Sequence, residues 1–188
     1  MMNELTVNDV YQKNEKVHEK FSALVATLDA ERGPSKDSDN WSFAQLVEHV
    51  ALVEDGMSRI CAKLLAKAEA DGKLADGPLE ISPEFIAKSE EIADVKLEAP
   101  ERVRPAGERS VADSLALIDE SRKRFEDMRP LFEKYDAAAN KFPHPYFGEI
   151  SAAEWLVLAG GHKARHLRQL IKMIEKSEAD RGQELPDA

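Results

Sequence analysis

The sequence of 188 residues lacks several features that would place it in particular protein classes. It has a single cysteine, Cys61, which excludes an internal disulfide framework and is typical of a reducing compartment. It has no excess of basic residues: 36 acidic and 26 basic residues give a net charge of −10, which argues against nucleic-acid binding. It also lacks an apolar run near the roughly 20 residues of a membrane span, and a secretory signal pattern. We therefore expect a cytoplasmic protein with neither nucleic-acid nor membrane partners.

The composition is that of a folded globular protein. Hydrophobic residues make up 43% and charged residues 33% of the chain, which excludes general disorder. A length of 188 residues supports one domain with a sizeable core. We expect residues 1–188 to form this single domain, with the polar segment 178–188 as a frayed tail. Cys61 lies beside Ile60 and Leu64 on an apolar helix side, so we expect it to be buried and inert.

Four segments combine a helix-capping pattern with an apolar repeat of three and four residues, which indicates amphipathic helices. The expected helices cover residues 6–32, 42–68, 110 to about 135, and 151–176. Their capping boxes pair Thr6 with Asp9, Ser42 with Gln45, Ser110 with Asp113, and Ser151 with Glu154. No segment alternates in the manner of a strand. The sequence therefore predicts an all-α four-helix bundle.

The connections between these helices differ in length. The first is a short polar loop that follows Gly33 and Pro34. The second, residues 69–109, contains a short helix opened by Ser82 and Pro83 and then two prolines and a glycine, so it reads as a crossover along the outside of the bundle. A long crossover lets the second and third bundle helices run parallel, which predicts up-down-down-up connectivity. The third connection contains a proline-stiffened aromatic loop at 142–147.

The last expected helix carries a histidine pair next to two glycines. His162 and His166 are four residues apart and lie on one helix face, so both can bind one transition-metal ion. Gly160 and Gly161 each cost about 1 kcal/mol relative to alanine inside a helix, which suggests that the site needs room. Such a pair is more often a solvated surface feature, so the interpretation requires a third ligand.

His49 is the candidate third ligand, because it lies at the border of an apolar stripe as the pair does. It is about 10 Å from the start of its helix, and His166 is about 15 Å from the end of its own, so antiparallel helices would bring the imidazoles together. A parallel arrangement would also bring them close. His18 is expected to be half exposed, with a solvent or carboxylate partner. Other charged residues on these helices are expected to point to solvent: Glu48, Glu54, Lys163, Arg165 and Arg168.

Three segments together resemble the DinB/YfiT-like superfamily of metal-dependent proteins. They are WSFAQLVEHV at 41–50, APERVRPAGERS at 99–110, and HPYFGEISAAEWLVLAGGHKARH at 144–166. The resemblance implies a four-helix bundle in which three histidines hold a metal, and His49, His162 and His166 stand at those positions. Some members of the superfamily transfer low-molecular-weight thiols or isomerise thiol adducts, whereas many have no assigned reaction.

Three imidazoles leave an open coordination position, which is the pattern of a catalytic zinc site. We therefore expect a metal-dependent transferase or hydrolase for a small molecule, with a thiol S-transferase preferred. The alternative is a non-catalytic, dimeric metal-binding or stress-related module. With either function we expect a homodimer. Zinc is the first choice of metal, and nickel, iron or copper are alternatives.

We expect the substrate pocket to open at one end of the bundle. Gly160 and Gly161 would supply its space, and the loop 142–147 with part of residues 69–109 would form its rim. Tyr146 and His144 are candidate polar groups on this rim, although packing within the turn is the simpler role for both.

Overall fold

The structure is a computed structural model and describes residues 5–28, 41–93 and 95–183. Five α-helices, one 3₁₀ turn and two short strands make up this part of the chain. They are α1 (Val7–Ala26), α2 (Phe43–Ala70), α3 (Pro83–Glu91), η1 (Glu101–Val103), α4 (Val111–Lys134), β1 (Lys141–His144), β2 (Gly148–Ser151) and α5 (Ala152–Gln183).

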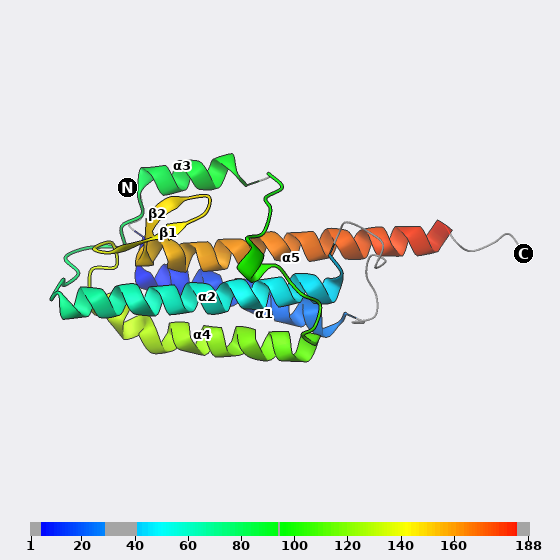
Figure 1. The fold of residues 1–188 in the computed structure, drawn as a ribbon, viewed down its shortest axis with the longest axis horizontal. Coiled ribbons are helices and arrows are strands. Elements are labelled where there is room, and N and C mark those ends of the chain that lie inside the picture. Colours follow the sequence, from blue (N-terminus) through cyan, green and yellow to red (C-terminus); the bar gives the residue numbers. More distant parts are fainter. Residues whose placement is uncertain (1–4, 29–40, 94, 184–188) are drawn as a thin grey trace, which may run out of the picture.

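The helices α1, α2, α4 and α5 form a four-helix bundle, as the sequence predicts (Figure 1). α1 and α5 run in one direction and α2 and α4 in the other, so the connectivity is up-down-down-up. α2 packs against both α4 and α5, and α5 also packs against α1. Helices α2 and α5, which carry the candidate histidines, are therefore antiparallel neighbours.

Local hydrogen bonds explain where the bundle helices begin. Thr6 and Ser42 form complete capping boxes with Asp9 and Gln45. Before α5, the Ser151 N–H donates to Glu154 Oε2 at 2.7 Å, and the Glu154 N–H donates to Ser151 Oγ at 3.3 Å. Ser110 Oγ accepts from the Asp113 N–H at 3.0 Å and donates to the Asp113 carboxylate at 2.6 Å, which is a variant of the box. Each cap satisfies backbone groups that the first helical turn leaves without a partner.

Two helix ends differ from the prediction. α1 ends at Ala26 and not at residue 32, because the Thr27 hydroxyl and N–H both donate to the carbonyl oxygen of Leu24 and close a tighter last turn. The predicted end at Gly33–Pro34 lies outside the described residues. α5 continues to Gln183, past Lys176, so the helix includes part of the segment predicted as a frayed tail.

The expectation of no strands was wrong for the segment before α5. β1 and β2 pair as an antiparallel hairpin, with Lys141 opposite Ser151 and His144 opposite Gly148. Gly148 has a φ of 70°, a conformation that glycine adopts without steric penalty, and it closes the turn. Each strand has only four residues, and β1 includes a proline, so neither shows a clear alternation of apolar and polar residues. We therefore predicted a loop for this segment.

Helix α2 has two apolar sides, although the sequence analysis grouped their residues into one core stripe. Val47, Ala51 and Cys61 are fully buried in the bundle. Val53 and Ile60, placed in the same core stripe by the sequence, are only half-buried and line a groove outside the bundle. Burial raises the pKa of the Cys61 thiol well above its ordinary value, which agrees with the expected inert cysteine. α2 therefore supplies a wall to the core and a floor to the groove.

The connection between α2 and α4 crosses the bundle on the side formed by α2 and α5 (Figure 1). The Gly107 N–H donates to Glu48 Oε2 at 2.9 Å, and the Arg165 guanidinium donates to the carbonyls of Ile92 and Ala93, each at 3.0 Å. Glu48 and Arg165 were expected to be solvated, but the crossover covers Glu48 and uses Arg165 as an anchor. No helix in the described part of the chain has the length and apolar character needed to cross a bilayer.

Candidate metal centre

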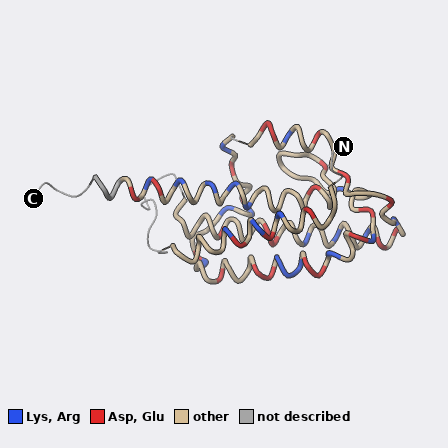
Figure 2. Tube along the Cα trace, turned by 180° about the vertical axis from the view of Figure 1, so that it is seen from behind, with Lys and Arg blue, Asp and Glu red and all other residues tan. Residues whose placement is uncertain are grey.

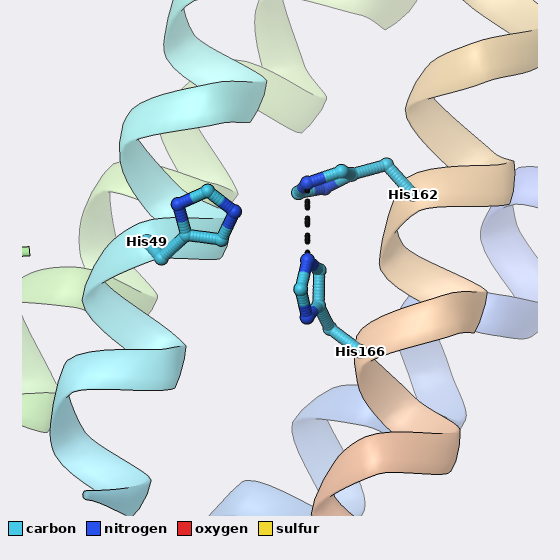
Figure 3. Close-up of side chains that lie close together, drawn as sticks. All are labelled: His49, His162 and His166. Atoms are coloured by element: carbon cyan, nitrogen blue, oxygen red, sulfur yellow. Dashed lines mark hydrogen bonds between the residues drawn. The ribbon is translucent and has the colours of Figure 1, made fainter. Parts of the chain in front are cut away.

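His49, His162 and His166 converge in the space between α2 and α5 (Figure 3). One ring nitrogen from each histidine lies within 4.8 Å of the other two. The Nε2 atoms of His162 and His166 are 3.1 Å apart. In a tetrahedral zinc site with Zn–N bonds of 2.0–2.1 Å, the ligand nitrogens are separated by about 3.3 Å. The pair already has this spacing, and His49 faces it from the opposite helix.

Two of the rings are held by hydrogen bonds through the nitrogen that faces away from the cluster. His49 Nδ1 lies 2.7 Å from the carbonyl oxygen of Val103, and His166 Nδ1 lies 2.9 Å from Gln169 Oε1. Both partners accept, so Nδ1 carries the proton and Nε2 presents its lone pair to the cluster. Partners of this kind orient histidine ligands in metal sites.

His162 has an unusual environment, because its buried Nδ1 has no hydrogen-bond partner among the described residues. If His162 Nε2 bears the proton and donates to His166, a buried acceptor is left without a partner. If instead Nδ1 bears the proton, the Nδ1–H is the group without a partner, and two Nε2 lone pairs face each other at 3.1 Å. A bound cation relieves the second arrangement, so the three residues fit a metal ion.

Burial keeps the three imidazoles neutral. It lowers the pKa of His49, lowers that of His166 to about 3, and holds the pKa of His162 well below its ordinary value. The neighbouring histidines lower the pKa of His162 further. Neutral imidazole is the form that binds metal, so the cluster is ready for a ligand at physiological pH.

The histidines open into a groove of about 1850 Å³. Its lining residues extend along α2 and α5 and include the hairpin, α3 and the crossover, so it follows the side of the bundle and is not confined to one end. Its lining includes the hairpin and part of residues 69–109, which were the expected rim. Within the described ranges, no fourth histidine, cysteine or carboxylate joins the three ligands.

His144 and Tyr146 both line this groove, but their hydrogen bonds stabilise the hairpin. His144 Nδ1 accepts the N–H of Tyr146 at 3.1 Å and that of Phe147 at 3.3 Å. Burial lowers the pKa of His144 to about 4, so it stays neutral as an acceptor. The Tyr146 hydroxyl donates to the carbonyl oxygen of Glu98 and thereby joins the hairpin to the crossover. Both residues hold the wall of the groove together.

The two adjacent glycines of α5 have different roles. A Cβ added to Gly160 would lie 1.9 Å from Asn14 Oδ1, whereas one added to Gly161 would meet nothing within 4 Å. The Asn14 amide donates to the carbonyl oxygen of Leu156 at 3.0 Å, so Asn14 is fixed against α5. Gly160 therefore allows the close approach of α1 and α5 and does not belong to the groove. Gly161 faces the groove, as predicted.

This difference predicts opposite effects of two alanine substitutions. Gly160→Ala should lower the free energy of unfolding by about 1–3 kcal/mol, because it displaces Asn14 and leaves buried polar groups without partners. Gly161→Ala should raise it by up to about 1 kcal/mol, because alanine is the better helix former and its methyl group has space. Urea unfolding of both variants provides the measurement, and equal effects at the two positions would contradict these roles.

A buried ion pair lies on the side of α5 that faces the bundle. Lys163 Nζ is 2.8 Å from Glu54 Oε1, and the two side chains are 7% and 5% exposed. His18 Nδ1 lies 3.3 Å from Lys163 Nζ, and His18 Nε2 lies 3.6 Å from the Asp119 carboxylate, as its expected carboxylate partner. The prediction that Glu54 and Lys163 are solvated was wrong, because α1 and α4 cover them.

The sequence did not identify the groups that hold the histidines. Gln169 lies three residues after His166 on the same helix face, a spacing that would have indicated contact. The Val103 carbonyl gives no sequence signal, because any residue of the crossover carries such a group.

Comparisons with known proteins agree with this architecture. The family model of the DinB superfamily matches residues 13–170 of the chain. A Bacillus subtilis (strain 168) protein described as uncharacterized protein YuaE is 21% identical over 166 residues, which cover 88% of this chain and 96% of the relative. The crystal structure of TT2238, a four-helix bundle protein, gives a TM-score of 0.55 at 23% identity and covers 88% of this chain and 98% of that one. The structural likeness supports the fold alone.

Proposed function

The chain belongs to the DinB superfamily, and from this premise we propose that it is a metal-dependent transferase or hydrolase that acts on a small molecule. The observation that carries the proposal is the convergence of three neutral imidazoles, two of them oriented by hydrogen bonds, in the lining of a groove. A site built only for structure normally has four protein ligands, whereas three ligands leave a position for water or substrate.

We assign His49, His162 and His166 as ligands of one divalent ion, zinc in the first instance and nickel or iron as alternatives. When bound at three histidines, such an ion lowers the pKa of a water molecule toward 7 or binds a thiol as thiolate. Val103 and Gln169 hold two of the rings with Nε2 toward the ion. Groups that orient the ligand histidines in this way raise the affinity for the metal and fix the geometry of the site.

The preferred version of this activity is the transfer of a low-molecular-weight thiol. The groove has apolar lining residues, with Val53 and Leu158 each one helical turn from a histidine and Ile60 further along α2, and this lining suits an electrophile with a hydrophobic portion. Its volume exceeds the roughly 300–1,000 Å³ of a typical ligand site, so a thiol and its acceptor can be present together.

The test is a comparison of Gly161→Leu with Gly161→Ala. The purified protein is loaded with zinc, nickel or iron and assayed for conjugation of cysteine to monobromobimane and for hydrolysis of 4-nitrophenyl acetate. We expect Gly161→Leu to lower turnover at least about tenfold while one metal ion per chain remains, because leucine fills the groove beside His162 without removing a ligand. Gly161→Ala should retain turnover.

Two outcomes contradict the proposal. In the first, the metal-loaded wild-type protein shows no turnover above the metal-free background in either assay. In the second, Gly161→Leu loses metal and turnover to the same extent, which would place the glycine at the ligands and not at a substrate site.

A further inference from the structure

The groove has a charge opposite to that of the chain. Although the net charge of the protein is −10, eight of the charged residues that line the groove are basic and two are acidic. One of the two, Asp55, is already bound by Arg59 at 2.8 Å and by Arg124 at 3.1 Å. The basic residues come from α5 and from the crossover, which share one groove only in the folded protein.

Four of these basic residues form one stripe on α5. Their spacing of three and four residues places them on the same helix face. Figure 2 shows basic positions recurring along the half of α5 that leads to the C-terminus. The stripe consists of Arg165, Arg168, Lys172 and Lys176.

The crossover brings two further arginines to the groove. Arg102 and Arg104 flank Val103, whose carbonyl oxygen lies 2.7 Å from His49 Nδ1. Both arginines line the groove. The crossover turn that orients His49 therefore also contributes two positive charges to the groove.

Six of the eight basic residues are exposed and form no hydrogen bond or ion pair with the described residues, and Arg104, Arg168 and Lys172 are among them. Arg165 differs, because its guanidinium is engaged by carbonyl groups of the crossover. Unpaired cations around a concave site raise the local concentration of anions.

We propose that the substrate of this site is a small anion, and that Arg104, Arg168 and Lys172 bind its carboxylate or phosphate group. The proposal rests on the proposed function for the position of the reacting atom at the histidines. Arg168 and Lys172 follow His166 by two and six residues, so the anionic group lies within about 9 Å of the histidines along the helix axis. Arginine suits both carboxylate and phosphate, because its planar fork donates two parallel hydrogen bonds.

A nucleic acid is the less suitable occupant. A long polyanion would extend beyond the groove and meet a protein surface that carries an excess of acidic residues. A small anion fits within the groove, where basic residues outnumber acidic ones by eight to two.

The test measures anion binding by isothermal titration calorimetry on metal-free protein at low ionic strength. The probes are succinate, inorganic phosphate, the uncharged analogue succinamide, and a single-stranded oligonucleotide. We expect succinate or phosphate to bind, succinamide not to bind, and added salt to weaken the binding. The preference between succinate and phosphate assigns the anionic group.

The variant Arg168→Gln/Lys172→Gln should weaken this binding at least about tenfold, which corresponds to about one hydrogen-bonded charge pair. Lys16→Gln/Lys20→Gln on α1 is the matched control, because it removes the same charge from exposed positions outside the groove. The affinity of this variant for succinate or phosphate should stay within about twofold of wild type.

Three results overturn the proposal: succinamide binds as tightly as succinate, the two double variants lose affinity equally, or the oligonucleotide binds more tightly than either small anion. Failure of the proposed function gives a different result. If the histidines hold no metal, metal analysis is negative while anion binding to the metal-free protein persists.

Discussion

Replacement of His162 and His166 together by alanine is expected to reduce the bound metal from one ion per chain to background. The variant removes two of the three ligands. Removal of a residue that only hydrogen-bonds to a ligand already lowers metal affinity about 10–100-fold. Loss of two ligands should therefore exceed about 100-fold. The measurement is elemental analysis after dialysis against each divalent metal, with circular dichroism to show that the helices remain.

Two other substitutions make this experiment specific. His144→Asn removes a histidine that lines the groove but stands outside the cluster, and it should leave the metal content unchanged. Gln169→Ala removes the partner of His166 Nδ1 and should lower affinity by about tenfold. Unchanged stoichiometry in the double variant, or equal loss in His144→Asn, would mean that the metal binds elsewhere.

Glu54→Ala is expected to destabilise the protein by about 3–5 kcal/mol, because it leaves the Lys163 ammonium group buried without its carboxylate. Lys163 lies against α1 and α2 with its side chain 7% exposed, so its charge has little contact with water. Urea unfolding followed by circular dichroism provides the measurement. Glu91→Ala is the comparison, because it breaks the exposed Lys88–Glu91 pair and should cost less than about 1 kcal/mol.

The double variant Glu54→Leu/Lys163→Met should recover most of the loss. Both charges are then absent, and apolar side chains of similar volume fill the space, which is often neutral or stabilising for a buried pair. If Glu54→Ala destabilises the protein no more than Glu91→Ala, or if the double variant is as unstable as Glu54→Ala, the pair does not act as a buried charge pair.

The sequence predicted the bundle because the relevant signals are local. A cap such as Ser151 with Glu154 acts within one turn, and apolar repeats define helix faces without knowledge of the neighbours. The spacing of His162 and His166 fixes their common face in the same way. His49 required more, namely the depth argument and the family resemblance, and the structure places it opposite the pair.

The hairpin before α5 and the end of α1 were less predictable. Four-residue strands give too few positions for an alternating pattern, and Thr27 closes α1 by a hydrogen bond that apolar periodicity does not report. Both are decided by a few local bonds and by packing, and not by a repeated pattern.

What the sequence determined by itself was which residues share a helix face, because that depends on the helical repeat alone. What only the tertiary structure decided was what each face meets. Gly160 and Gly161 are neighbours in the chain, yet one contacts Asn14 of α1 and the other the groove. Lys163 and Arg165 looked equally exposed, yet one pairs with Glu54 inside the bundle and the other anchors the crossover. Burial, partners and the basic lining of the groove arise from contacts between segments far apart in sequence, and no local pattern records those contacts.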